Sequence, residues 1–164
     1  MATILMIGAF DTKGLEYAFL REELLVRGHQ VLAVDTGVVG EGNDFPVDVR
    51  AEEVAQMGGS TLEALRAAGD RGSAMKVMSD GAALCAQKLY DEGRFAGIVG
   101  MGGSGGSSVV TAAMRALPVG VPKVCISTVA SGDTSAYVGA KDVVLVPSIV
   151  DVAGINRISR VIFS

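Results

Sequence analysis

The chain has 164 residues, a formal net charge of −4 and 49% hydrophobic residues. This length suits a single domain with a full hydrophobic core. The negative charge, with no basic stripe, excludes a nucleic-acid-binding surface, and no apolar run approaches the ~20 residues that a membrane-spanning helix needs. The 22 glycines and the absence of tryptophan favour tightly layered helices and strands over an aromatic-rich sandwich.

Cysteine and histidine are too few for the common metal and thiol sites. Cys85 and Cys125 lie in apolar patterns, and we expect both to be buried in a reducing compartment. His29 is the single histidine, so neither a zinc site nor a Ser-His-Asp or Cys-His catalytic set can be assembled. The N-terminus shows no basic region and no cleavage pattern, and we expect a cytoplasmic location.

The first part of the chain predicts a strand, a loop, a helix and a second strand. Thr3–Gly8 is apolar on both faces, as central parallel strands are. We expect a loop at Ala9–Gly14 and a strand at Val31–Val34 that closes on Asp35. The helix between them is expected to end at Gly28 and to carry an apolar stripe of Leu15, Ala18, Phe19, Leu25 and Val26.

The tract that follows is irregular and charged. Gly37–Pro46 predicts a loop with three glycines. Arg50–Arg71 contains two short helical patterns, and the second opens at the capping box Ser60-Thr61-Leu62-Glu63. Its default interpretation is a solvated cover, with a lid or an interface as alternatives. Ser73–Glu92 then predicts a longer helix whose methionines fill the core.

Strands and helices alternate through the rest of the chain. The chain ends inside an apolar helical pattern without a C-cap signal, so we expect residues 1–154 to form the domain and residues 155–164 to begin a connecting helix to a second domain. A terminal helix docked on the core is the alternative. The expected elements are strands at Gly97–Met101, Pro122–Ser127 and Val143–Val146, a helix ending at Leu117, a loop at Thr128–Gly139 and a helical start at Ile155–Phe163.

This alternation predicts an α/β fold, a Rossmann-like, doubly wound, open parallel sheet of about five strands with helices on both faces. We expect the flavodoxin-like strand order 2-1-3-4-5, with other doubly wound orders as alternatives. In such a sheet, ligands bind outside the carboxyl ends of the strands, where the strand order reverses.

The segment Gly97–Ser108 leads from a strand into a helix through four glycines and a serine. Glycines let backbone N–H groups approach an anion, and a helix N-terminus adds unpaired donors and a positive dipole end. The match of Gly100–Gly105 to G-x-G-x-x-G is not a dinucleotide fingerprint, because Pro122–Ser127 brings no carboxylate, and no lysine follows as in a P-loop. We therefore expect an anion cradle of backbone amides and serine hydroxyls. The alternative is a tight turn that needs glycine only for its dihedral angles.

Four loops at the strand ends bring hydroxyls, amides, a lysine and carboxylates to this edge. They suit a nucleotide with Mg²⁺, since a lysine can pair with phosphate and Asp11 or Asp133 can offer oxygen to a hard cation. Each residue also has a plainer explanation as a helix cap or an Asx turn. Asp35 could touch a nucleotide sugar, although the first loop disfavours NAD. The candidate nucleotide-binding residues are Asp11, Thr12, Lys13, Gly102, Gly103, Ser104, Gly105, Gly106, Ser107, Ser127, Thr128, Ser131 and Gly132, and the candidate metal ligand is Asp133.

These segments resemble a known family. The matching stretches are Gly8–Gly14, Gly100–Ser108, Ser127–Thr134 and Tyr137–Ser159, and the resemblance is to the family typified by the tomato-mosaic-virus resistance protein of plants. It runs nearly end to end. The resemblance implies an N-terminal ATP-binding domain of Rossmann-like fold, followed by a second α/β domain, in a protein that tends to dimerise. It implies a ligand but no reaction.

The sequence therefore predicts a domain that binds ATP, with Mg²⁺, and acts as a nucleotide-dependent binding or regulatory module in a homodimer. The alternative is an enzyme domain for a small phosphorylated or carboxylated metabolite, whose anion lies in the Gly102–Ser108 loop. A pure oligomerisation scaffold without a ligand is a third interpretation.

Overall fold

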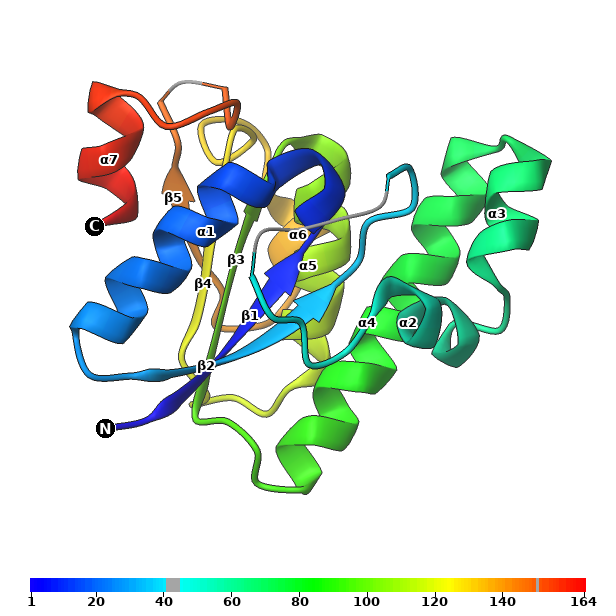
Figure 1. The fold of residues 1–164 in the computed structure, drawn as a ribbon, viewed down its shortest axis with the longest axis horizontal. Helices are drawn as coiled ribbons and strands as arrows, with labels where there is room; N and C mark the ends of the chain where they lie inside the picture. Colours follow the sequence, from blue (N-terminus) through cyan, green and yellow to red (C-terminus); the bar gives the residue numbers. More distant parts are fainter. Residues whose placement is uncertain (41–44, 150) are drawn as a thin grey trace.

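A computed structural model describes residues 1–40, 45–149 and 151–164, so part of the predicted Gly37–Pro46 loop and Val150 lie outside the described residues. Five parallel strands form one sheet in the order β2-β1-β3-β4-β5 (Figure 1), which confirms the predicted fold class and strand order. The elements are β1 (Thr3–Gly8), α1 (Phe10–Val26), β2 (Gln30–Asp35), α2 (Ala51–Met57), α3 (Leu62–Ala68), α4 (Arg71–Asp91), β3 (Gly97–Gly102), α5 (Ser104–Ala116), β4 (Lys123–Ser127), α6 (Ser135–Val138), β5 (Val144–Pro147) and α7 (Arg157–Phe163).

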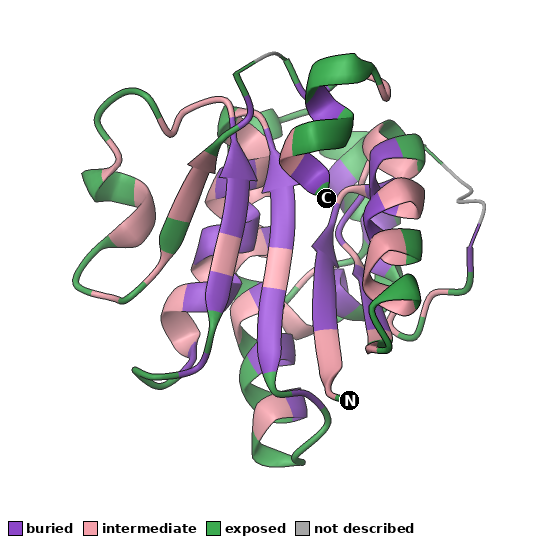
Figure 2. Cartoon of the chain, turned by 90° about the vertical axis from the view of Figure 1, so that its left-hand side faces the viewer, coloured by how far each residue is buried: buried purple, intermediate pink, exposed green. Residues whose placement is uncertain are grey.

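Helices cover both faces of the sheet. α1 and α7 lie on one face, and α2, α3, α4 and α5 lie on the other (Figure 1). Successive residues of β1 point to opposite faces, so Leu5 and Ile7 pack under α4 and α5 while Met6 packs under α1. Figure 2 shows that the central strands are mostly buried, whereas β5 at the edge is only partly covered.

Helix α1 begins earlier than the sequence predicted. It starts at Phe10, directly after β1, so the expected loop at Ala9–Gly14 is wrong. Asp11 and Thr12 suit this position, because an acidic residue is favourable in the first turn of a helix. Lys13 departs from helical dihedral angles (φ −127°, ψ 26°) and separates this first turn from the rest of the helix.

The predicted apolar stripe of α1 is right for Ala18 and Phe19, which pack against the core, and wrong for Leu15 and Val26. Leu15 and Val26 are 65% and 82% exposed, whereas Phe10, Tyr17 and Leu20 are buried against the sheet. The buried residues are seven and three positions apart, which places them on one side of a helix with 3.6 residues per turn. Apolar character alone did not distinguish this side from the solvent-facing one.

The glycine loop is shorter than predicted. β3 continues to Gly102 and α5 begins at Ser104, which leaves Gly103 as the single residue between strand and helix. The predicted Thr128–Gly139 loop contains one helical turn, α6. The last helix, α7, packs beside α1 and buries Phe163 in the core of that face.

The hydroxyl group of Tyr17 separates the carboxyl ends of β1 and β3. Direct pairing of the two strands ends at Met6. Beyond it, Tyr17 Oη lies 2.8 Å from the carbonyl oxygens of Ile7 and Met101 and accepts a hydrogen bond from Met101 N–H at 2.7 Å. Burial raises the pKa of Tyr17, so the phenol stays protonated and can donate. A Cβ at Gly8 would lie 1.8 Å from Tyr17 Oη, so glycine is required there.

Replacing Tyr17 with phenylalanine should lower the free energy of unfolding by about 1–3 kcal/mol, because the buried N–H of Met101 would lose its acceptor. Urea unfolding followed by circular dichroism measures the change. Tyr90→Phe is the matched control, since the Tyr90 ring packs on Phe95 and its hydroxyl has no hydrogen-bond partner among the described residues. Equal stability of the two variants would contradict the role given to the Tyr17 hydroxyl.

Buried Lys123 ties the start of β4 to the segment before β5. Its Nζ donates hydrogen bonds to the carbonyl oxygens of Pro118 and Val121 at 2.7 and 2.8 Å, and to Asp142 Oδ1 at 2.8 Å. The side chain of Lys123 is fully buried, whereas that of Asp142 is partly exposed. The hydrogen bond from Lys123 lowers the pKa of Asp142 to about 2.

The stability that Asp142 contributes should depend on pH. Its pKa in the folded protein lies below the ordinary value of 3.8, so its contribution is fully present above about pH 4 and is lost as the pH falls towards 2. The difference in unfolding free energy between wild type and Asp142→Asn should therefore shrink across this range. Denaturant unfolding at a series of pH values measures it. A difference that stays constant would contradict the charged pairing with Lys123.

Candidate functional site

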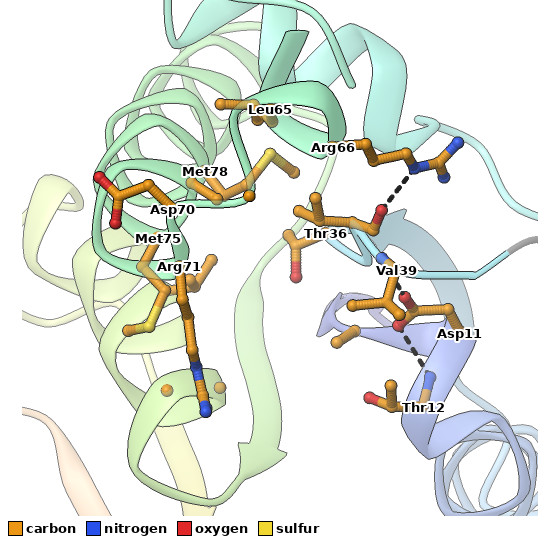
Figure 3. A pocket seen from close by; sticks show the side chains of 17 residues that line it. Asp11, Thr12, Thr36, Val39, Leu65, Arg66, Asp70, Arg71, Met75 and Met78 are labelled. Carbon is orange, nitrogen blue, oxygen red and sulfur yellow. Dashed lines mark hydrogen bonds between the residues drawn. The ribbon is translucent and has the colours of Figure 1, made fainter. Parts of the chain in front are cut away.

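A cavity of about 560 Å³ lies where the strand order reverses, and we call it the switch-point cavity. The start of α1, the residues after β2, α3, α4 and the start of α5 line it, and the start of α1 lies across from α4 (Figure 3). In doubly wound sheets, this crevice at the carboxyl ends of the strands is the place where ligands bind.

The glycine turn brings backbone donors to this cavity. Gly102 permits close packing, since a Cβ there would lie 2.9 Å from Gly106 Cα, whereas Gly105 and Gly106 line the cavity. The N–H groups of Ser104, Gly105 and Gly106 open α5 and have no preceding helical carbonyl. The described part of the chain offers them no other acceptor. Glycine therefore serves the tight turn and also leaves donors open.

Arg71 reaches across the cavity from the start of α4 to α5 (Figure 3). A Cβ atom on Gly105 would lie 3.2 Å from Arg71 Nη2 and 3.3 Å from Met75 Sδ. No described residue pairs with the Arg71 guanidinium. A cation beside the positive end of a helix dipole is unfavourable, so an anion bound between Arg71 and α5 would stabilise both.

The rest of the cavity is mostly apolar. Leu65 of α3, Met75 and Met78 of α4, Val38 after β2 and Val109 of α5 line it. Met78 is only 1% exposed and belongs to the core that the sheet shares with α4 and α5. An apolar lining next to anion donors suits a ligand that combines an organic group with a phosphate.

Two charged side chains hold the segment after β2 at the rim of the cavity. Asp11 Oδ2 accepts hydrogen bonds from the N–H groups of Val39 and Gly40 at 2.9 and 3.0 Å, and its Oδ1 accepts one from Thr12 N–H at 2.8 Å. Arg66 donates to two carbonyl oxygens of the same segment at 2.6 and 3.3 Å. Asp11 does not cap α1, as its plainer explanation held, because the N-cap residue is Ala9 and has no side-chain cap, and Asp11 binds the segment after β2 instead. Its contact with a nucleotide stays a prediction.

Asp35 ends β2, at the position where dinucleotide-binding folds hold a ribose. Its Oδ1 accepts hydrogen bonds from the N–H groups of Phe10 and Gly37 at 3.1 and 2.9 Å. Burial raises the pKa of Asp35, and these two hydrogen bonds oppose the shift. The carboxylate therefore joins the segments that follow β1 and β2. The next residue, Thr36, lines the cavity.

The predicted residues at the end of β4 lie around a second pocket of about 290 Å³. Thr128 and Ser131 line it together with Asp151, and Thr128 Oγ1 lies 3.8 Å from a Cβ placed on Gly103. Gly132 N–H donates to Val129 O at 3.1 Å within the same loop. The structure thus divides the predicted site, with Asp11, Thr12, Gly105 and Gly106 at the switch-point cavity and Thr128 and Ser131 at the second pocket.

Ser107 and Ser127 form a buried contact between α5 and β4. Their Oγ atoms lie 2.5 Å apart, and Ser107 Oγ also donates to Gly102 O at 3.3 Å. The N–H of Ser107 donates to Gly103 O at 2.9 Å. Both hydroxyls therefore have protein partners and fix the glycine turn on β4, and their contact with a nucleotide stays a prediction.

Lys13 and Asp133 also have protein partners. Lys13 Nζ donates to Val152 O. Asp133 Oδ1 accepts a hydrogen bond from Ser135 N–H at 3.0 Å, and the backbone and side-chain hydrogen bonds of Ser135 lower the pKa of Asp133. Across the residues that the structure describes, no three His, Cys, Asp or Glu side chains gather as a metal site. The metal role of Asp133 remains a prediction.

The residues that α4 and the end of β2 bring to the cavity, Arg71 and Thr36, were not among the predicted site residues. The helix was expected from Ser73, whereas α4 begins at Arg71 behind Asp70, whose carboxylate caps it. A capping aspartate directly before Arg71 was the signal that could have placed this arginine at a helix start. Nothing in the sequence around Thr36 distinguished it from other residues that follow a strand.

Fold and site together define the class of this protein, a doubly wound α/β domain with a ligand-sized cavity at its switch point. None of the described helices has the length and apolar character needed to cross a membrane. The family model for the N-terminal domain of the uncharacterised protein family UPF0261 matches residues 2–164. The chain belongs to this family.

Similar proteins support this assignment and show how much of a full-length family member the chain represents. The chain is 46% identical over 161 residues to a UPF0261 protein of Clostridium tetani and 42% identical over 162 residues to one of Mesorhizobium japonicum, with 98% and 99% of the chain covered. It is 50% identical over 94 residues to the ToMV resistance protein Tm-1(GCR237) of tomato, which covers 57% of the chain and 12% of that protein. The family resemblance is thus confirmed. The chain spans about two fifths of the length of the bacterial relatives, which is consistent with a second domain.

Proposed function

We propose that this domain binds an adenine nucleotide, ATP with Mg²⁺, in the switch-point cavity. One observation carries the proposal: the unpaired guanidinium of Arg71 lies beside the open N–H groups of the first turn of α5, at one end of a largely apolar cavity. Phosphate oxygens accept hydrogen bonds from both groups, and the apolar lining accommodates the base. The resemblance to the plant family supports ATP as the particular nucleotide.

The chemistry of the lining favours binding over turnover. Asp11 and Asp70 are the carboxylates that line the cavity, and each accepts hydrogen bonds from backbone N–H groups. Asp11 accepts with both carboxylate oxygens and Asp70 with one, so both side chains support the backbone around the cavity. We therefore propose a nucleotide-dependent binding or regulatory module, in which any reaction requires the rest of the full-length protein.

Mg²⁺ would enter with the nucleotide. This ion keeps several waters and is commonly bound by phosphates together with one or two carboxylates. The phosphates would supply most of its ligands, and Asp133, exposed after β4 and outside the lining of the switch-point cavity, is the carboxylate that the sequence predicts for it. A homodimer in the cytoplasm completes the proposal and rests on the resemblance and the composition of the chain.

Replacing Arg71 with alanine should weaken ATP binding about tenfold or more and leave adenosine binding unchanged, because a hydrogen bond to a charged group contributes about 1.5–3 kcal/mol. Isothermal titration calorimetry measures both affinities. Arg94→Ala is the matched control, since Arg94 lies beside Glu92 away from the cavity. If wild type binds no ATP, the proposed function is wrong. If Arg71→Ala binds ATP as wild type does, Arg71 has no part in it.

A valine at Gly105 should block the phosphate end of the cavity. The new side chain meets the flexible ends of Arg71 and Met75, so we expect the fold to persist and ATP affinity to fall at least tenfold, as estimated for the loss of charge-assisted contacts. Gly14→Val is the control, because a Cβ at Gly14 meets no neighbour within 4 Å. Full ATP affinity in Gly105→Val, measured by calorimetry, would place the phosphates elsewhere.

The alternative, an enzyme domain for a small phosphorylated or carboxylated metabolite, is favoured by one observation. The second pocket, lined by Thr128, Ser131 and Asp151, is polar and lies next to the glycine turn. A thermal-shift screen of nucleotides, sugar phosphates and acyl-CoAs separates the two functions. A ligand present at ~100 times its Kd raises the free energy of unfolding by ~2.7 kcal/mol, so binding raises the melting temperature. Stabilisation by a sugar phosphate but not by ATP would favour the enzyme, and no stabilisation would favour a scaffold.

A further inference from the structure

Thr36 places a hydroxyl group at the switch-point cavity, and this hydroxyl has no hydrogen-bond partner among the described residues. The residue follows β2 and is 6% exposed, and its side chain lines the switch-point cavity (Figure 3). Thr36 Oγ1 makes no hydrogen bond to any of the residues 1–40, 45–149 and 151–164. The backbone is fixed, because Thr36 N–H donates to Gly8 O at 2.8 Å. This backbone hydrogen bond to the last residue of β1 fixes the position of Thr36 at the cavity.

This hydroxyl differs from the other buried ones that the structure describes. Ser107 and Ser127 pair with each other, Thr111 donates to Ser107 O at 2.8 Å, and Ser159 pairs with Asn156. The buried side-chain polar atom without a partner among the described residues is His29 Nδ1, so solvent still reaches Thr36 Oγ1 from the cavity. A hydroxyl that faces a cavity and makes no protein contact is available to a ligand there.

The position of Thr36 indicates which part of the ligand it meets. Doubly wound folds hold the ribose of a nucleotide at the carboxyl end of their second strand, usually through a carboxylate. Here the carboxylate in that region, Asp35, does not line the cavity, and its Oδ1 is bonded to Phe10 N–H and Gly37 N–H. Thr36 is the next residue, and its hydroxyl can both donate and accept a hydrogen bond.

We propose that the Thr36 hydroxyl binds a ribose hydroxyl of the nucleotide and makes the cavity selective for ribonucleotides. The inference rests on the proposed function and adds the sugar to it. Arg71 and α5 would hold the phosphates, Thr36 the sugar, and the apolar side chains the base. Inorganic phosphate or a small carboxylated metabolite would bind Arg71 and the N–H groups of α5 but would leave the Thr36 hydroxyl without a partner.

Replacing Thr36 with valine tests this selectivity, because valine keeps the shape of the side chain and removes the hydroxyl. Wild type should bind 2′-deoxy-ATP or 3′-deoxy-ATP about fivefold more weakly than ATP, the factor expected for one hydrogen bond. Thr36→Val should bind ATP and that analogue equally, and Thr36→Ser should restore the difference. Calorimetry with the three nucleotides measures these affinities.

The melting temperature without ligand provides a second readout. Since the Thr36 hydroxyl has no protein partner, unliganded Thr36→Val should melt at the same temperature as wild type or higher. Thr111→Val is the matched control and should melt lower, because the buried Thr111 hydroxyl donates to Ser107 O. A lower melting temperature for Thr36→Val would reveal a protein partner for the hydroxyl and overturn the inference.

The outcomes separate this inference from the proposed function. If wild type binds none of the three nucleotides, the proposed function fails and the inference fails with it. If wild type binds ATP and Thr36→Val binds it equally well, the inference alone is overturned. If Thr36→Val still binds ATP more tightly than the deoxy analogue, another residue binds the ribose hydroxyl. That result overturns the inference and does not affect the proposed function.

Discussion

The hydroxyl of Tyr17 is the contact on which the candidate site depends. Two neighbouring parallel strands would normally stay paired to their ends, but here a side chain from α1 takes the hydrogen-bonding places of Ile7 and Met101. The segments that follow β1 and β3 are therefore held apart. Glycine at position 8 is the local condition for this arrangement, because a Cβ there would collide with the phenol. Residues that follow the two strands line the switch-point cavity, Ala9 and Asp11 after β1 and Gly105 and Gly106 after β3.

Most charged groups around the cavity serve the protein itself. Asp11 and Arg66 bind the backbone of the segment after β2 from two sides, and Asp35 joins that segment to the start of α1. These contacts define the rim of the cavity. Arg71, the hydroxyl groups of Thr12 and Thr36, and the first N–H groups of α5 have no hydrogen-bond partner among the described residues and are open to a ligand. The cavity thus favours a ligand that accepts hydrogen bonds at one end.

The fold could be predicted from the sequence because buried parallel strands are nearly continuous apolar runs separated by helical patterns. The position of the glycine turn at the carboxyl end of β3 could also be predicted, because the glycines come directly after an apolar run. The functions of Asp11 and Lys13 could not, because their partners, Gly40 and Val152, lie far away in the sequence. Arg71 was not predicted because it begins α4, a helix that covers the sheet. The prediction considered only the loops that follow strands, where ligands of parallel sheets usually bind.

The glycine turn can be both a tight turn and an anion-binding site, the two interpretations that its sequence allows. Gly102 packs directly on Gly106, as a tight turn demands, and Ser107 is bonded to Ser127 beneath it. This rigid support orients the N–H groups of the next residues without using them. A donor group that the fold positions but leaves unpaired is suited to a ligand, because no protein contact must break when the ligand binds. The same reasoning applies to Thr36, so the residues that follow β2 and β3 would supply preformed contacts, and Arg71 would add a further one from α4.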